Sequence, residues 1–219
     1  MIYDAAKHST TNGTRLLLAR HAETSAPYRF HGAESDIGLS EWGARQASLL
    51  GQSLTGRGAV ALYSSAMRRA VDTAAAVGRA CSLESIPIAP LHERKIGPLS
   101  GQSREEGWAT YAATKARWIA GDLEHTHPGG ESYADIRRRV VPIVEDLASR
   151  HRGGTIIVVA HGVLIRVVIT SLVSGFQPDD FDRIAIDFAS VNDLFFDGTT
   201  WSAGLLNQVV AASDSRPVA

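Results

Sequence analysis

Short apolar runs alternate with longer amphipathic segments along most of this 219-residue chain. Runs that are apolar throughout predict buried strands at Leu16–Ala19, Val60–Tyr63, Ser85–Ala89 and Thr155–Ala160. Segments of helical period predict helices at Ser40–Leu54, Ala66–Arg79, Arg104–Ala120 and Ser132–Arg150, with another after His161. Because strands alternate with helices, the pattern predicts an α/β fold, a three-layer α/β/α sandwich with a mostly parallel central sheet.

The C-terminal part has a different pattern. Residues 184–206 alternate between apolar and polar positions, and Asp197-Gly198 is a turn signal. We therefore expect antiparallel strands joined by a hairpin at one edge of the sheet. No repeat or low-complexity linker divides the chain, so we expect one domain over residues 1–219, with a frayed tail at 211–219.

Composition excludes several classes of protein. A formal net charge of −1 gives no global basic field of the kind that nucleic-acid-binding proteins use. No apolar run reaches the ~18 residues that a membrane span needs, and the N-terminus lacks the apolar core of a signal peptide. A single cysteine, Cys81, rules out an internal disulfide and fits a reducing compartment. We expect a soluble, cytoplasmic protein that binds neither nucleic acid nor membrane.

The ends of three predicted strands carry side chains that could bind an anion. The first strand ends in Arg20 and His21, the helix after the second opens with Arg68 and Arg69, and the fourth ends in His161. In an open α/β sheet, ligands bind outside the carboxyl ends of the strands, beside helix N-termini. If these strands are neighbours, two histidines and at least one arginine share a pocket that suits a phosphate.

Five segments in order resemble the signatures of the histidine phosphatase superfamily, the phosphoglycerate-mutase-like proteins. These segments are "RHAET", "YSSAMRRAVDTA", "LHERKIGPLSG", "PGGESYADIRRRV" and "VVAHGVLIR". The resemblance runs from about residue 15 to residue 207. It implies a phosphoryl-transfer enzyme of the same α/β/α fold that acts on a small phosphorylated metabolite.

The resemblance also implies a role for each matched position. His21 would be the nucleophile that becomes a phosphohistidine, His161 the second pocket histidine, and Glu93 the proton donor to the leaving group. Arg20, Gly162 and Arg69, which stands directly before the alanine of its motif, would bind the phosphate. Arginine suits this task because its fork binds phosphate through two parallel hydrogen bonds and stays charged. The cationic side chains can stabilise the transferring group alone, so we expect neither a metal ion nor a cofactor.

Several positions depart from the mutase branch of the family. Position 22 is Ala where the commonest form has Gly, position 27 is Pro where mutases have Asn, and Val163 replaces a second Asn. The adjacent Arg-Arg pair that holds a substrate carboxylate in mutases has no counterpart. These differences favour a phosphatase, in which water accepts the phosphoryl group. A mutase-type phosphotransferase, a degenerate member that binds a phosphorylated ligand without turnover, and a phosphohistidine protein phosphatase stay open as alternatives.

Residues 102–127 are expected to form a lid or cap over the pocket. Trp108, Tyr111 and Trp118 share one helical face there. We interpret this stripe as packing on the core in preference to a wall for the leaving group.

Other candidate substrate contacts come from a loop that matches the family. Arg29, His31 and Gly32 lie there and are candidates for substrate binding. His125 and His127 lack obvious further ligands, so we expect a solvated loop instead of a metal site. The identity of the phosphoester and the oligomeric state do not follow from the sequence.

Overall fold

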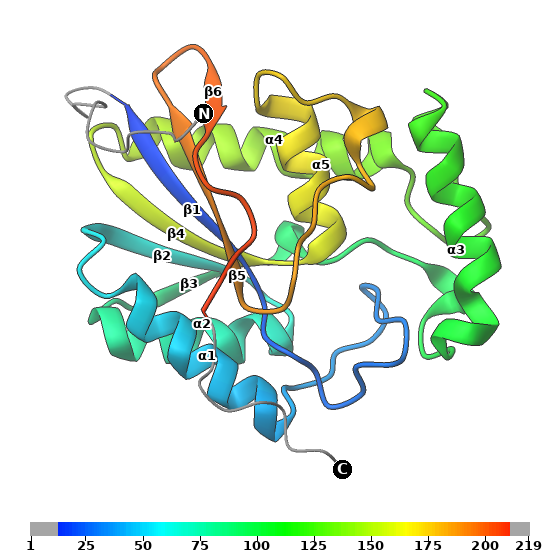
Figure 1. The fold of residues 1–219 in the computed structure, drawn as a ribbon, viewed down its shortest axis with the longest axis horizontal. Helices are drawn as coiled ribbons and strands as arrows, with labels where there is room; N and C mark the ends of the chain where they lie inside the picture. Colours follow the sequence, from blue (N-terminus) through cyan, green and yellow to red (C-terminus); the bar gives the residue numbers. More distant parts are fainter. Residues whose placement is uncertain (1–12, 211–219) are drawn as a thin grey trace.

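The computed structural model describes residues 13–210, and a mixed β-sheet runs through its centre (Figure 1). The strands are β1 (Thr14–Arg20), β2 (Ala59–Ser65), β3 (Ser85–Ile88), β4 (Thr155–Ala160), β5 (Ser190–Phe196), β6 (Trp201–Ala203) and β7 (Gln208–Val209). Their order is β3-β2-β4-β1-β5-β6, and β7 pairs with β5. The first four strands run parallel, whereas β5 is antiparallel to β1, β6 and β7. The carboxyl ends of β1, β2, β3 and β4 therefore meet at one edge.

Side chains of the central strands alternate between two hydrophobic clusters, one on each face of the sheet. In β1, Leu16 and Leu18 belong to one cluster and Leu17 and Ala19 to the other. Helices α4 (Tyr133–Arg150) and α5 (Gly162–Leu172) cover the first face, and α1 (Glu41–Leu54) and α2 (Arg68–Cys81) cover the second (Figure 1). Burial on both faces is why these runs are apolar throughout. The predicted three-layer α/β/α architecture is confirmed.

Most predicted elements occur close to their expected bounds. Strand β4 matches its prediction, and the Ser40 side chain accepts the N–H of Gly43 as the N-cap of α1. The C-terminal hairpin forms between β5 and β6 around Asp197. Helix α2 starts at Arg68, two residues later than predicted, and ends where Ser82 takes a left-handed conformation.

Two predictions about strands are wrong. Residues 184–189 do not form a strand, because the backbone there bends across the carboxyl edge of the sheet instead of pairing with it. Strand β3 is not buried on both faces, because it is the edge strand and pairs with β2 alone. Pro87 lies in its centre and removes one backbone donor, as is common in edge strands.

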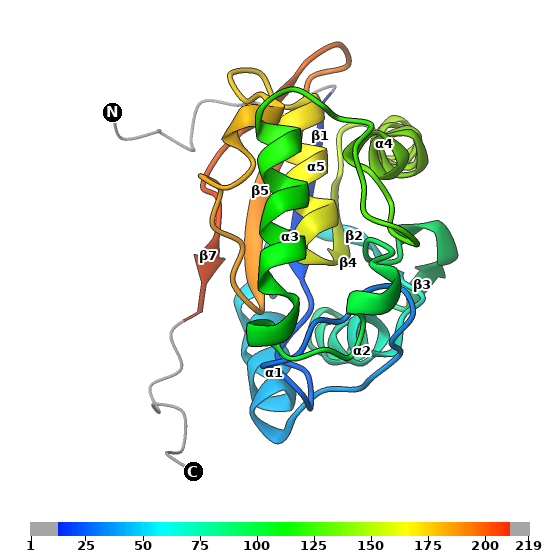
Figure 2. The same cartoon turned by 90° about the vertical axis from the view of Figure 1, so that its right-hand side faces the viewer.

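Helix α3 (Arg104–Ile119) stands apart at one side of the sandwich (Figure 1), and it lies at the front when that side faces the viewer (Figure 2). Ser103 and Glu106 form a reciprocal capping box at its start. Its C-terminal half reaches the body of the molecule, where the ring of Trp118 lies 5.5 Å from that of Phe181. Within residues 13–210, no helix is both long and apolar enough to cross a membrane.

Candidate active site

Strands β1 and β4 bring His21 and His161 together. The two strands are parallel neighbours with Arg20 beside Ala160, so the next residue of each strand leaves the sheet at the same point. The backbone N–H of His21 donates to the carbonyl of Ala160 at 2.9 Å, and the two imidazole rings lie 5.1 Å apart. Both histidines are buried. The pocket expected from two distant motifs therefore forms at the carboxyl edge of the sheet.

The hydrogen bond of the His21 ring determines its tautomer. Nδ1 lies 2.8 Å from the carbonyl oxygen of Ala22, and because a carbonyl oxygen only accepts, Nδ1 carries the proton. Nε2 of the neutral ring then has a free lone pair. Burial, reinforced by the positive charges of Arg69 and Arg20, lowers the pKa of His21 well below its ordinary value. The ring is thus held as a neutral base whose Nε2 can act as a nucleophile.

Thr73 of α2 fixes the backbone beside this ring. Its hydroxyl accepts the N–H of Ala22 at 3.0 Å and donates to the carbonyl of Arg69 at 2.7 Å. The strand end that carries His21 is thereby tied to the first turn of the helix that carries Arg69.

The structure separates the two adjacent arginines of α2. Arg68 is exposed and pairs with Asp72, whereas Arg69 is 1% exposed and donates to the carbonyl of Ser35 at 2.8 Å. Helix α2 begins at Arg68, so Arg69 lies in its first turn. Just before the helix, the hydroxyl of Ser65 accepts the N–H of Met67.

Arg20 is held by the loop that precedes β5. Its guanidinium stacks on the ring of Phe188, with Cζ 3.9 Å from the ring centre, and Nη1 donates to the carbonyl of Ile186 at 2.7 Å. Its buried Nε has no hydrogen-bond partner among the described residues. Burial lowers the pKa of Arg20 to about 10, so it stays charged at neutral pH.

Two backbone N–H groups position the carboxylate of Glu93. Oε1 accepts from the N–H of Arg94 at 2.8 Å, and Oε2 accepts from the N–H of Val163, in the first turn of α5, at 3.2 Å. The side chain is buried and bonds to the backbone instead of to the side chains of Arg94 or Lys95. Glu93 therefore forms no exposed salt bridge with either of these neighbours.

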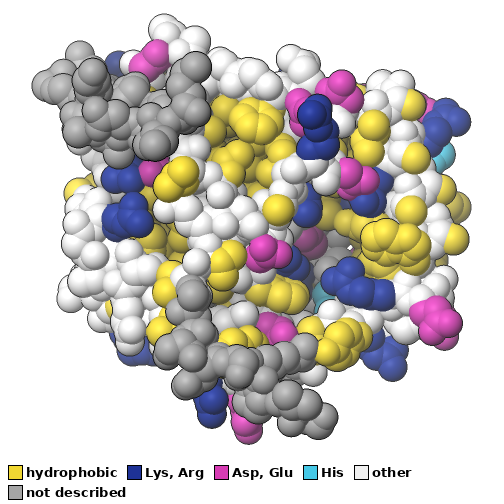
Figure 3. Space-filling view, in the orientation of Figure 1, with side chains coloured by type: hydrophobic (Ala, Val, Ile, Leu, Met, Phe, Trp, Pro, Cys, Tyr) yellow, Lys and Arg dark blue, Asp and Glu magenta, His cyan; other side chains and the backbone are white. Residues whose placement is uncertain are grey.

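These side chains surround a cavity of about 250 Å³. Figure 3 shows basic, acidic and histidine side chains gathered around a hollow on one face of the molecule. The lining includes the sequence-predicted residues Arg20, His21, Arg29, His31, Arg69, Glu93 and Gly162. His161 lies below the lining, fully buried, and neither ring nitrogen has a partner among the described residues. Burial and the charge of Arg69 lower the pKa of His161 well below its ordinary value.

The three loop residues predicted to bind substrate differ in their position at the cavity and in their hydrogen bonds. Arg29 donates to the carbonyl of Gly101 at 2.6 Å and lines the cavity. Both ring nitrogens of His31 are within hydrogen-bond distance of protein atoms, Ser35 Oγ at 2.8 Å and the Ala26 carbonyl at 2.9 Å. Gly32 is not part of the lining; a Cβ there would lie 2.8 Å from the carbonyl oxygen of Arg94. Gly32 therefore permits a close approach of two backbone segments.

The aromatic stripe of α3 divides between core and cavity. Trp118 is 0% exposed and packs in the core, as expected. Trp108 is 50% exposed and lines the cavity together with Tyr111, so the interpretation of the whole stripe as core is wrong. The N-terminal half of the helix packs through Tyr111 on a small apolar cluster of Phe30, Ile96 and Leu99, and Trp108 lies outside that cluster.

The interpretation of 125–127 as a solvated loop is wrong for His127. This residue is buried, and its Nε2 donates to the carbonyl of Ile96 at 3.0 Å. Nδ1 is left as an acceptor and lies 3.3 Å from Nη2 of Arg94. Among residues 13–210, no three or more His, Cys, Asp or Glu side chains are grouped so that they could hold a metal ion.

Sequence reasoning missed several residues of the cavity. Phe188 lies in a segment that was expected to be a strand, and no local signal marks it. Arg166 follows Gly162 by four residues on α5, and this helical spacing could have indicated that it faces the same cavity. Lys115 also lines the cavity and pairs with Asp182 at 2.6 Å.

The fold and this cluster of residues match the histidine phosphatase type of protein. The family model of the histidine phosphatase superfamily (branch 1) matches residues 16–209, and the chain belongs to this family. Phosphoserine phosphatase 1 of Hydrogenobacter thermophilus is 34% identical over 177 residues, which cover 80% of this chain and 83% of that protein. A 2,3-bisphosphoglycerate-dependent phosphoglycerate mutase of Mesorhizobium japonicum is 32% identical over 167 residues, 72% of this chain and 80% of the mutase.

Solved structures agree with this assignment. The complex of mycobacterial glucosyl-3-phosphoglycerate phosphatase with inorganic phosphate superposes with a TM-score of 0.77 at 27% identity, covering 89% of this chain and 97% of that one. The chain spans about half the length, 54%, of a bifunctional protein of Mycobacterium tuberculosis to which it is 32% identical over 199 residues. The homologues therefore include phosphatases of small phosphorylated metabolites.

Proposed function

We propose that the protein is a metal-independent phosphomonoesterase that hydrolyses a small phosphorylated metabolite through a phosphohistidine on His21. The observation that carries this proposal is the hydrogen bond from Nδ1 of His21 to the Ala22 carbonyl, at 2.8 Å. It leaves Nε2 unprotonated and accessible from a cavity lined by Arg20 and Arg69. A neutral nucleophile facing fixed positive charge is what attack on a phosphate dianion requires.

The reaction proceeds in two steps. Nε2 of His21 bonds to phosphorus while the bond from phosphorus to the ester oxygen breaks, and the carboxyl group of Glu93 gives its proton to the departing oxygen. A water molecule then attacks the phosphohistidine, Glu93 takes a proton from that water, and inorganic phosphate leaves. Arg20 and Arg69 hold the phosphoryl oxygens throughout, and the buried His161 lies beside His21, beneath the cavity lining.

Two positions favour a phosphatase over a mutase-type phosphotransferase. Pro27 and Val163 replace the two asparagines of the mutase pattern, and both line the cavity. An apolar side chain at each position removes hydrogen bonds that would retain a phosphorylated product for return transfer. The lid segment 102–127, which carries α3, would set which leaving group fits.

The first experiment measures phosphate release from a panel of phosphomonoesters in the presence of EDTA. We expect the wild-type protein to turn over at least one ester and the His21→Ala variant to release none. His125→Ala, a histidine outside the cavity lining, is the matched control and should keep its activity. An intermediate on His21 should also appear as protein-bound phosphate that survives alkali and is lost in acid. If no ester is hydrolysed while a phosphate-containing ligand still binds, the protein is a degenerate binding member.

A further inference from the structure

Glu93 differs from the pocket histidines in how the fold carries it. Both histidines directly follow a strand of the sheet. Glu93 lies instead in residues 92–95, an irregular segment between the short 3₁₀ helices Ala89–Leu91 and Gly97–Leu99. Because this segment has no strand or helix ladder of its own, other contacts must hold the side chain that is assigned to give a proton.

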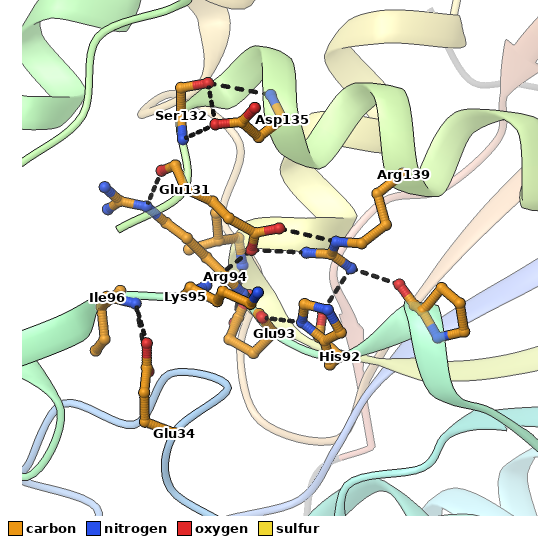
Figure 4. Close-up of polar contacts among 12 residues, drawn as sticks. Glu34, His92, Glu93, Arg94, Lys95, Ile96, Glu131, Ser132, Asp135 and Arg139 are labelled. Carbon is orange, nitrogen blue, oxygen red and sulfur yellow. Dashed lines mark hydrogen bonds and ion pairs between the residues drawn. The ribbon is translucent and has the colours of Figure 1, made fainter. Parts of the chain in front are cut away.

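One ion pair holds this segment on the side that precedes Glu93. Arg139 of α4 donates to both carboxylate oxygens of Glu131, at 3.0 and 2.9 Å, and both side chains are largely buried. Nη1 of Arg139 also donates to the backbone carbonyls of Pro90 and His92 (Figure 4). The guanidinium therefore binds a carboxylate and the backbone of the segment at the same time.

The carboxylate of Glu131 holds the side that follows the acid. Oε2 accepts the N–H of Lys95 at 2.8 Å, and the backbone N–H of Glu131 donates to the Lys95 carbonyl at 2.9 Å. Glu34 accepts the next N–H, that of Ile96, at 3.0 Å. Figure 4 shows these contacts along the backbone that carries the acid.

The carboxylate of Glu93 depends on the position of this backbone. Oε1 accepts the N–H of the next residue, Arg94, at 2.8 Å, and Oε2 accepts the N–H of Val163 at 3.2 Å. The first contact moves with the segment, so a shift of the segment would move the carboxylate relative to the nucleophile. Neither Arg139 nor Glu131 lines the cavity, so neither can act on the substrate directly.

We propose that the Arg139–Glu131 ion pair is a positioning device for catalysis, which holds the backbone on both sides of Glu93 so that its carboxyl group reaches the leaving-group oxygen. The proposal rests on the phosphatase function proposed above. It assigns a role in the reaction to the segment "PGGESYADIRRRV", which supplies both partners. A buried ion pair adds little net stability, because the cost of taking two charges out of water offsets their attraction. Its contribution here is the geometry of the acid.

The test uses two esters that differ in their need for a proton. An alkyl phosphate needs a donor for its departing oxygen, whereas para-nitrophenyl phosphate has a stable leaving group that does not. A misplacement of about 1 Å costs on the order of 100-fold, so Arg139→Met should lower kcat for the alkyl ester by about 10- to 100-fold and for the aryl ester by less than about 3-fold. KM for both esters should stay within about 2-fold, because no contact with the substrate is lost. Arg150→Met is the matched control and should change neither ester, because Arg150 is an exposed arginine of the same helix that pairs with Asp146.

A double substitution shows whether the ion pair acts through Glu93. A protein that carries Glu93→Gln has no proton donor to position, so adding Arg139→Met should not lower kcat for the alkyl ester any further. Glu131→Gln removes the charge of the other partner and tests the same prediction if Arg139→Met does not fold. Arg139→Lys keeps the charge without the fork and should retain part of the activity toward the alkyl ester.

Glu93→Gln separates the two possible failures. If it lowers kcat for the alkyl ester alone, while the variants of Arg139 and Glu131 lower kcat equally for both esters, the pair supports only the fold and the positioning role is overturned. A loss from Arg139→Met that adds to the loss from Glu93→Gln overturns it as well. If Glu93→Gln affects both esters alike, or no ester is hydrolysed, the proposed function fails at the proton donor or as a whole, and the positioning role fails with it.

Discussion

Replacing Glu93 with Gln tests the proton donor in the proposed reaction. The substitution keeps the shape of the side chain and removes its ability to give a proton. General acid catalysis by a positioned side chain contributes about 10²- to 10⁴-fold, so kcat/KM for an alkyl phosphate should fall by that factor. A nitrophenyl ester has a stable leaving group that needs no proton. The same variant should therefore lose much less activity toward para-nitrophenyl phosphate.

The structure also predicts a cost in stability. Each carboxylate oxygen of Glu93 accepts one backbone N–H, from Arg94 at 2.8 Å and from Val163 at 3.2 Å. A glutamine has one oxygen and one NH₂ group, so one buried N–H loses its acceptor. Leaving a buried donor unsatisfied costs about 1–3 kcal/mol, which at roughly 2–4 °C per kcal/mol lowers the melting temperature measurably.

The assay is phosphate release from both esters at several pH values, together with a thermal melt. Glu105→Gln is the matched control, because Glu105 is an exposed carboxylate at the start of α3. An equal loss of activity toward the alkyl and the aryl ester would refute the reasoning. Glu93 would then act by positioning the α5 terminus and not as an acid.

Other predictions follow from burial in the same region. The pKa of His21 and of His161 lies below the ordinary value of about 6.5, so the unfolded chain binds more protons than the folded protein as pH falls. The free energy of unfolding, measured in urea, should therefore be constant above about pH 6.5 and decrease below it, by up to about 1.4 kcal/mol per pH unit for each histidine. A flat profile down to about pH 5.5 would contradict this. Trp118→Ala should lower the free energy of unfolding by about 3–5 kcal/mol, whereas Trp108→Ala should change KM with little loss of stability. Equal melting temperatures of the two variants would show that Trp118 does not lie in the core while Trp108 faces the cavity. Thr73→Val leaves the backbone N–H of Ala22 without an acceptor and should lower the free energy of unfolding by about 1–3 kcal/mol, measured in urea. Thr55→Val, at an exposed position, is the control.

The amino-acid sequence determined the sheet and the place of the site. A run such as Leu16–Ala19 is apolar throughout because both of its faces are covered, and this is a property of the run itself. The chain also specifies that such runs end in Arg20-His21 and in His161. The sequence places these residues around one pocket only if the strands are neighbours, and the strand order of the structure, with β4 between β1 and β2, shows that they are.

Only the tertiary structure decided which side chains face the cavity. Helical spacing put Trp108 and Trp118 on one face, but the core reaches only the second, because α3 stands away from the sheet. The sequence marks Phe188 with no local pattern, and the motif that contains Arg94 does not show what its side chain contacts. Their contacts come from segments that are distant along the chain: Phe188 packs on Arg20, and the guanidinium of Arg94 bonds to Glu131.

The physical reason is that periodicity specifies a direction for a side chain and not what it meets there. Whether Arg94 is exposed, paired or buried without a counter-ion depends on where the carboxylate of Glu131 points, and Arg139 of α4 already occupies that carboxylate. The local sequence thus determined the strands and the reactive residues at their ends. Packing between distant segments decided which charges are compensated.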